Sequence, residues 1–356
     1  MPGPYANLIS RWEQRLNSVD QDRRLTPFAW GGEWLRRTPM NGVREWPELA
    51  PASDVLPSLR VWNQRVLEAS EAFFTYDPVA DYRLDAGPDG ATLRFSSPVA
   101  TPWPENQTVY GRWFPAPGRK RAVVVVAQWN ADAGSHIGLS RILQRAGLSA
   151  LRVSMPYHDR RMPAELRRAE YAVDSNIGRT IHAARQAVCD IRASLDWLAG
   201  EGYESLGILG TSLGSCYALL ASAHDPRLRV NVFNHISQYF GDVVWTGLAT
   251  SHVRRSLDPY LDQDQLREAW RTISPASYLE QFAAMSARAP KISLLLWARY
   301  DPCFLPAFSR QVVASFDRLQ LKHQARCLPC GHYTIGRFPF KYADAWLMTR
   351  FLRRHL

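Results

Sequence analysis

Three segments of this 356-residue chain carry residue types that together could perform nucleophilic catalysis. Ser212 is the middle residue of a Gly-x-Ser-x-Gly pentapeptide, Asp301 follows an apolar run, and His332 comes later still. A serine hydroxyl is a poor nucleophile unless a base takes its proton, and an acid must fix the tautomer of that base. Serine, aspartate and histidine in this chain order therefore predict a catalytic triad for acyl transfer.

The elements around Ser212 have the pattern that this chemistry requires. Residues 206–209 predict a buried strand and residues 213–224 predict a helix, so Ser212 would occupy a sharp turn between them. Gly210 and Gly214 supply small neighbours for that turn. The start of the helix would direct free backbone amides at negative charge forming beside the serine.

Two later strands are expected to position the acid and the base. Residues 291–298 predict a strand that ends just before Asp301, and residues 319–328 predict a last strand before His332. We expect Asp301 to orient His332 and His332 to act as the base. If Asp301 does not serve, Asp242 is the next candidate for the acid.

The attacked carbonyl becomes an oxyanion, which needs hydrogen-bond donors. One donor should be the backbone amide of Leu213, directly after the nucleophile. The other should come from the loop after the strand predicted over residues 121–127, through the amide of Asn130 or Trp129. Trp129 is also expected to form a wall of the acyl pocket.

Composition narrows the classes of partner. The 43 basic and 33 acidic residues give a net charge of +10, but the arginines are scattered in pairs without a long basic run or a nucleic-acid motif. A basic, solvated surface is one interpretation; arginines that attract an anionic substrate are the other. No stretch approaches 18 apolar residues, so no membrane span is expected. The first residues do not resemble a signal peptide, which predicts a cytoplasmic protein.

The five cysteines do not predict a disulfide framework, because their number is odd and no export signal is recognised. Cys327 and Cys330 form one C-x-x-C pair beside His332, which leaves redox sensitivity as a minor alternative. A single such pair excludes a four-cysteine zinc site. Because the chain has no phosphate-binding loop, haem motif or dense cluster of metal ligands, we expect neither a cofactor nor a metal.

The chain is expected to fold as an α/β core with two additions. Strands and helices alternate over residues 81–235 and 287–356, which predicts a parallel sheet. Residues 1–80 predict an N-terminal helical extension. Residues 236–286 interrupt the alternation and predict a helical cap, whose aromatic residues we expect to form a small core of its own.

The triad segments resemble the alpha/beta-hydrolase superfamily over about residues 90 to 356. Within it, residues 155–161, 201–214 and 244–247 resemble a poorly characterised abhydrolase-domain family with a Pro-Tyr-x-x-Arg segment. The resemblance implies an alpha/beta-hydrolase fold, with a mostly parallel sheet and helices on both of its faces. It also implies ester or related acyl hydrolysis. It places Tyr157, His158 and Trp245 at the border of a substrate pocket.

These observations favour a serine hydrolase that cleaves a small-molecule carboxylic ester through an acyl-enzyme intermediate. A thioesterase, a lipase-like enzyme or an amide-cleaving hydrolase would use the same triad and is the alternative. A non-catalytic binding protein on the same fold belongs to a different class, and the presence of Ser212, Asp301 and His332 argues against it.

Overall fold

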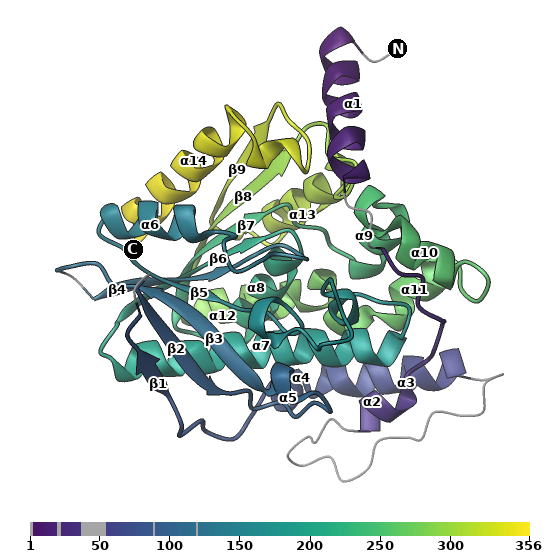
Figure 1. Cartoon of the computed structure of the whole chain (residues 1–356), viewed down its shortest axis with the longest axis horizontal. Coiled ribbons are helices and arrows are strands. Elements are labelled where there is room, and N and C mark those ends of the chain that lie inside the picture. Colours follow the sequence, from purple (N-terminus) through teal and green to yellow (C-terminus); the bar gives the residue numbers. More distant parts are fainter. Residues whose placement is uncertain (1–2, 20–22, 37–54, 88–89, 119) are drawn as a thin grey trace.

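The computed structural model describes residues 3–19, 23–36, 55–87, 90–118 and 120–356 (Figure 1). A nine-stranded sheet runs through the middle of the molecule in the order β1-β2-β3-β5-β4-β6-β7-β8-β9. Its strands are β1 Arg83–Asp85, β2 Ala91–Ser96, β3 Thr108–Phe114, β4 Arg121–Val126, β5 Ser149–Val153, β6 Ser205–Thr211, β7 Leu228–Asn234, β8 Ile292–Ala298 and β9 His323–Leu328. None of the described helices combines the length and apolarity needed to span a bilayer.

The sheet is mixed, and its larger part is parallel. β1, β2 and β3 pair antiparallel, and β3 pairs antiparallel with β5. All pairings from β5 through β4, β6, β7 and β8 to β9 are parallel. The carboxyl ends of these strands therefore meet at one edge, where open α/β sheets bind their ligands.

Consecutive valines in β4 are buried on both faces of the sheet. Val124 and Val126 belong to the larger apolar cluster, while Val123 and Val125 belong to a second cluster on the other face. An unbroken apolar run is typical of a parallel strand covered by helices on both sides. The predicted mostly parallel sheet with two helical layers is confirmed.

Helices cover each face of the sheet. The second apolar cluster lies under α6 (Ile137–Arg145) and α14 (Phe340–His355). The helices that pack on the larger cluster at the opposite face include four that follow strands of the sheet or lead into them (Figure 1). These are α7 Ile177–Gly200, α8 Leu213–His224, α12 Leu279–Arg288 and α13 Pro306–Arg318.

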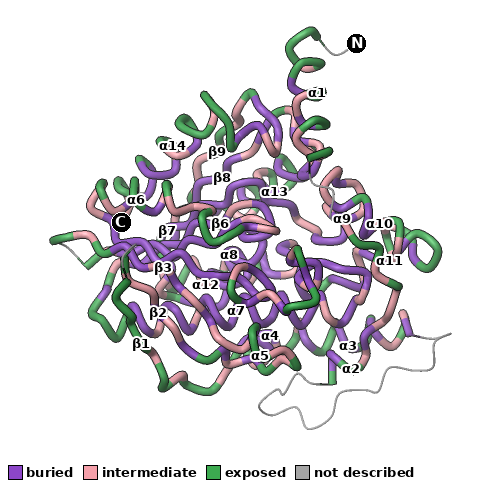
Figure 2. Tube along the Cα trace, viewed as in Figure 1, coloured by how far each residue is buried: buried purple, intermediate pink, exposed green. Residues whose placement is uncertain are grey.

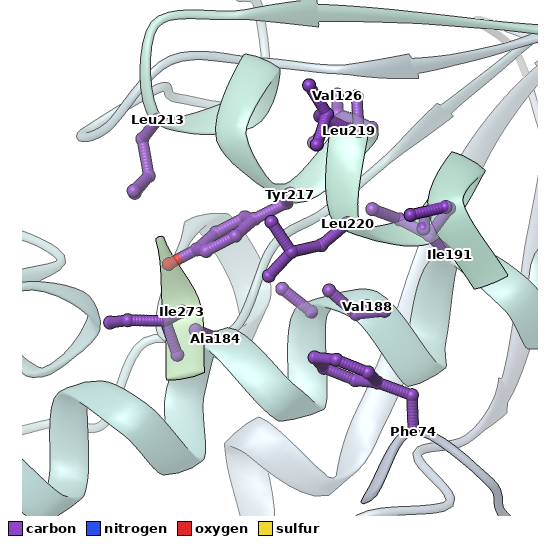
Figure 3. Packing of buried hydrophobic residues seen from close by; sticks show 14 of the residues in the cluster. Phe74, Val126, Ala184, Val188, Ile191, Leu213, Tyr217, Leu219, Leu220 and Ile273 are labelled. Atoms are coloured by element: carbon purple, nitrogen blue, oxygen red, sulfur yellow. The ribbon is translucent and has the colours of Figure 1, made fainter. Parts of the chain in front are cut away.

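The helix after Ser212 is buried along its whole length. Each residue of α8 is buried, and Leu219 and Leu220 lie between the sheet and α7 (Figure 3). Val188 and Ile191 of α7 face them. A helix that is apolar all round is fixed by its surroundings, so the start of α8 is a rigid base for Ser212.

The N-terminal residues are integrated into the same core. Trp62 of α3 (Val55–Glu68) and Phe73 of α4 (Ser70–Phe73) are buried in the larger cluster. Phe74 lies beneath α8 beside Val188 (Figure 3). The remaining helices before β3 are α1 Pro4–Ser18, α2 Gly32–Arg36 and α5 Pro104–Gln107. Figure 2 shows α1 as a largely exposed helix in its outer turns, whereas α3 and α4 border the buried interior.

The segment 236–286 does not have an apolar core of its own. It forms α9 (Phe240–Thr246), α10 (Ser251–Leu257), α11 (Gln263–Ala269) and α12. Phe240, Trp270 and Tyr278 all belong to the larger cluster of the sheet. The indole of Trp270 also donates to the carbonyl of Ile177 in α7 at 3.2 Å. The predicted separate aromatic core is therefore wrong. These aromatic side chains pack in the core of the sheet and hold the segment against it.

The end of the chain differs from the predicted pattern in one place. The last strand begins at His323, because α13 and the turn after it occupy the preceding residues. Helix α13 has an amphipathic pattern that places Val312 and Phe316 in the core. Short 3-10 helices connect these elements, at Asp159–Arg161, Glu170–Ala172, Leu248–Thr250, Arg271–Ile273, Pro275–Tyr278 and Thr334–Gly336.

Truncation of a buried side chain in residues 55–74 tests whether this segment is part of the core of the sheet. We expect Phe74→Ala to lower the free energy of unfolding by about 3–5 kcal/mol, because it opens a cavity beneath α8. Trp346→Ala removes an aromatic ring that is 56% exposed on α14 and is the control, with an expected loss below about 1 kcal/mol. Urea unfolding of both variants measures the difference. Equal losses would contradict the packing described for residues 55–74.

Candidate active site

The turn between β6 and α8 holds Ser212 in a strained backbone conformation. Its φ is 56° and its ψ is −119°, a region that non-glycine residues seldom occupy. A Cβ on Gly210 would lie 2.3 Å from the carbonyl oxygen of Gly214. A Cβ on Gly214 would lie 2.4 Å from the carbonyl oxygen of Val126. Both glycines are therefore required by the close approach of backbone to backbone.

The structure brings the three predicted triad residues together. The hydroxyl of Ser212 lies 3.2 Å from Nε2 of His332, and Nδ1 of His332 lies 2.9 Å from Oδ2 of Asp301. Ser212 stands at the end of β6, Asp301 follows β8 and His332 follows β9. The arrangement lets Ser212 lose a proton to His332 while Asp301 holds the opposite ring nitrogen.

Asp301 is a buried carboxylate whose oxygens are occupied. Its Oδ1 accepts from the backbone amides of Cys303 and Phe304 at 2.7 and 2.8 Å, while Oδ2 accepts from His332. Burial alone would raise the pKa of this carboxyl, but the charges of the two neighbouring imidazoles and their hydrogen bonds to it outweigh burial and hold the pKa well below the usual value. Asp301 is therefore ionised.

The pKa of His332 is shifted in the opposite direction. Burial lowers the pKa of its imidazole, and the charge and hydrogen bond of Asp301 more than offset this, so the pKa is raised above the ordinary value. The ring stacks on Phe304 with centroids 5.5 Å apart. His332 is therefore both oriented and made a better proton acceptor by its neighbours.

A second imidazole, which the sequence motifs did not predict, lies against the same carboxylate. Nδ1 of His235 is 2.7 Å from Oδ2 of Asp301, and the His235 ring lies 4.7 Å from that of His332. Burial lowers the pKa of His235, which keeps it neutral. Its position directly after β7, at the same edge as Ser212, is a signal that could have identified it.

The structure separates the two candidates for the second oxyanion donor. The amide of Asn130 donates to Nε2 of His158 at 3.0 Å and is thus not available. Within the described residues, the amides of Trp129 and Leu213 donate to no other protein group. Asn130 is corrected as a donor, whereas Trp129 and Leu213 remain the candidates.

His158 was expected to border the pocket, but it lines neither cavity and instead holds the loop of Trp129 and Asn130 in place. Its Nδ1 lies 2.8 Å from the carbonyl of Pro156, which can only accept, so the proton is on Nδ1 and Nε2 accepts from Asn130. Burial lowers the pKa of His158 to about 4, which keeps the ring neutral. The indole of Trp129 is fixed as well, by donation to the carbonyl of Ala169 at 2.8 Å.

A narrow apolar cavity of about 50 Å³ opens beside Ser212. Its walls come from the start of α8, from α9 and the turn after it, and from the loop after β8. The lining residues are Trp129, Val173, Ser212, Leu213, Cys216, Phe240, Val243, Val244, Ala249, Thr250, Cys303, Phe304 and His332. Trp129 therefore lies where a wall of the acyl pocket was expected.

Three other expected residues lie elsewhere. Tyr157 is fully buried and packs against Trp103 with ring centroids 5.5 Å apart. Trp245 lies beneath the guanidinium of Arg254 and lines neither cavity beside Ser212. Both are corrected as pocket residues. Asp242, the alternative acid, pairs with Arg267 at 2.9 Å instead of with His332.

A wider cavity of about 660 Å³ lies on the other side of Ser212, between α6 and α14. It includes the basic side chains Arg168 and Lys341. Its wall also contains Asp344, whose two carboxylate oxygens accept from Nδ2 of Asn234 at 3.2 and 3.1 Å. Burial raises the pKa of Asp344 to about 7.

His235, Asp301 and His332 also place nitrogen and oxygen atoms within 4.8 Å of one another, which is the spacing of a metal-ligand set. Because two of these side chains are already joined by a hydrogen bond of the triad, we assign no metal ligands here. Cys327 and Cys330 are free thiols, and burial raises the pKa of Cys330, which makes that thiol less reactive.

No family model and no curated protein matches this chain. Solved structures do resemble it. Acetyl xylan esterase 1 from Thermoanaerobacterium has a TM-score of 0.57 and 15% identity, with 90% of this chain and 98% of that chain covered. An acetyl xylan esterase from Paenibacillus has a TM-score of 0.57 and 16% identity, with 91% and 99% covered.

An acylaminoacyl peptidase from Pyrococcus horikoshii has a TM-score of 0.56 and 13% identity. The match covers 83% of this chain but only 44% of the peptidase, so this chain spans less than half the length of that protein. Together with the strand order and the two helical layers, these likenesses show that the chain has the alpha/beta-hydrolase fold.

Asp344 gives a prediction on stability and pH. Its pKa is near 4 in the unfolded chain and about 7 in the folded protein. As pH rises between these values the unfolded state alone ionises, so the folded state loses stability, and the loss persists at higher pH. Asp344→Asn removes this loss. We expect its free energy of unfolding to rise relative to wild type by about 3 kcal/mol from about pH 5 to about pH 8.

Chemical unfolding at the two pH values measures this difference. Glu204→Gln, which alters an exposed acid, is the control and should follow the wild type at both. A difference between Asp344→Asn and wild type that does not change with pH would contradict the raised pKa.

Proposed function

We propose that the protein is a serine hydrolase that cleaves esters of short carboxylic acids through an acyl-enzyme intermediate. The observation that carries the proposal is the continuous contact from Ser212 through His332 to Asp301. It stands beside the backbone amides of Leu213 and Trp129, which have no partner among the described residues, at the carboxyl edge of a sheet of the alpha/beta-hydrolase fold.

In the proposed reaction, His332 accepts the proton of Ser212 as its hydroxyl attacks the ester carbonyl. Asp301 stabilises the imidazolium that forms, and it stays ionised because its oxygens are held by hydrogen bonds. The amides of Leu213 and Trp129 donate to the oxyanion, and each such donor contributes a few kcal/mol to lowering the barrier. His332 then protonates the departing alcohol, and water hydrolyses the acyl-enzyme by the same steps.

The narrow cavity supports a short acyl group. A single water-sized group needs about 10–15 Å³, so the cavity of about 50 Å³ holds about three to five such groups. That space fits an acyl chain of about two to four carbons. The two neighbouring structures named as acetyl xylan esterases act on an acetyl ester by that name, which agrees with this size.

The wider cavity is proposed to take the alcohol part of the ester. Its volume is more than ten times that of the narrow cavity, and its wall carries both basic and acidic side chains. We also propose that α9 and the turn after it cover the acyl side of the site, since Val243, Val244 and Thr250 line the narrow cavity.

Removal of the nucleophile tests the proposed chemistry. Ser212→Ala should lower kcat roughly 10⁶-fold, because the triad acts as one unit. It should also abolish labelling by a fluorophosphonate while the circular dichroism spectrum stays unchanged. Ester turnover in the purified variant above a few per cent of wild type, or fluorophosphonate labelling at another serine, would contradict the assignment.

Enlarging the narrow cavity tests the acyl preference. With p-nitrophenyl esters from acetyl to octanoyl, the wild type should prefer the shortest chains, and Val243→Ala should move the optimum to a longer chain. Val253→Ala removes the same volume from α10 at a buried position that lines neither cavity, so it should keep the wild-type order. A preference for octanoyl in the wild type would overturn the short-chain proposal. Thioester and anilide analogues of the best substrate separate the alternative reactions.

A further inference from the structure

The N-terminal helix α1 lies against the loop that carries His332. Figure 1 shows α1 beside the ends of β8 and β9, on the opposite side of the view from α2, α3 and α4. The hydroxyl of Tyr5 donates to the carbonyl of Pro329 at 2.5 Å. The hydroxyl of Tyr333 lies 2.8 Å from Oδ1 of Asn17. Helix α1 thus contacts residues on both sides of His332.

The central contact is made by Glu13. One of its carboxylate oxygens accepts from the amide of Tyr333 at 2.9 Å, and the other accepts from the amide of Thr334 at 2.8 Å. Glu13 is only 1% exposed. A buried carboxylate is costly unless it is hydrogen-bonded, and here the partners on the described part of the chain are two backbone amides that directly follow His332.

The loop is shaped to receive this side chain. A Cβ on Gly331 would lie 2.4 Å from the carboxyl carbon of Glu13, so only glycine leaves room there. The amide of Gly331 donates to the hydroxyl of Thr334 at 2.8 Å, which closes the loop around His332. His332 therefore lies in a loop in which the residue before it, Gly331, and the residues after it, Tyr333 and Thr334, all contact Glu13.

We propose that Glu13 is a positioning residue for His332: it fixes the backbone after the imidazole and places a negative charge near the imidazolium that forms during catalysis. This role rests on the proposed function, in which His332 is the base. It gives the N-terminal helix a part in the chemistry although Glu13 is more than 300 residues away from His332 in sequence.

The charged and titratable groups that face His332 come from four elements. They are Asp301 after β8, His235 after β7, Glu13 on α1 and Tyr333 on its own loop. Burial lowers the pKa of His332, the charge of Asp301 raises it most, and the charge of Glu13 raises it further. Loss of the charge at position 13 should therefore lower the pKa of His332.

Two substitutions in the full-length protein separate charge from packing. Glu13→Gln keeps the size of the side chain but removes its charge, and its amide nitrogen cannot accept a backbone hydrogen bond. Glu13→Ala removes both acceptors. Gln14→Ala is the control, since Gln14 is exposed on the same helix.

We expect Glu13→Gln to move the acidic limb of the kcat/KM profile to lower pH and to lower the pKa of His332 in an NMR titration of carbon-13-labelled histidine. His332→Gln assigns the signal. Glu13→Ala should lower kcat by about 10- to 100-fold with a smaller change in KM, because the base is displaced. Gln14→Ala should match the wild type in all three measurements.

An unchanged His332 pKa together with an unchanged kcat in folded Glu13→Gln would overturn the proposal. If Glu13→Ala does not fold, Glu13→Gln alone decides. The NMR titration needs no substrate, so it tests Glu13 even if the protein does not hydrolyse esters. Failure of the proposed function would instead appear as a wild type that neither turns over esters nor reacts with fluorophosphonate.

Discussion

The buried carboxylate of Asp301 is the constraint on which the arrangement around Ser212 depends. An ionised carboxylate away from water is stable only when its oxygens are paired, and three hydrogen bonds and a nearby second imidazole do this here. The donors come from the loops after β8 and β9, and the second imidazole follows β7. Parallel pairing of these strands brings all of them to one edge, so the register of the sheet positions the site.

Segments outside the sheet hold the loops that carry the site residues and line the cavities beside Ser212. His158 and Ala169, which lie in the segment between β5 and α7, fix the loop of Trp129. Helix α9 lines the narrow cavity beside Ser212, and Glu13 of α1 accepts from two backbone amides in the loop of His332. Backbone strain is also present around the site, since Asn130, Ser212 and His235 have positive φ in the segments that follow β4, β6 and β7. Such strain persists only where surrounding contacts over-determine the backbone.

The sequence allowed the local features to be predicted because each rests on neighbouring residues. The four valines of β4, the pentapeptide at Ser212 and the order of Ser212, Asp301 and His332 all led to elements that the structure contains. Contacts between distant residues could not be predicted in this way. Nothing near Glu13 in sequence indicates that it accepts from Thr334, and nothing near Asn130 indicates that His158 occupies its amide. The prediction that Tyr157 borders the pocket was wrong because an aromatic side chain is equally common in a pocket wall and in a buried core, and Tyr157 is buried in the core.

The central claim is that Ser212 forms a covalent acyl intermediate in a site assembled around Asp301. Peptide mass spectrometry of the wild-type protein, quenched with acid during the first turnovers of p-nitrophenyl acetate, tests it most directly. We predict an acetyl group on the peptide that contains Ser212, formed in a burst with nitrophenol release and lost on longer incubation. Release of nitrophenol without an acetylated Ser212 peptide, or acetylation of a different residue that matches the burst, would contradict the account.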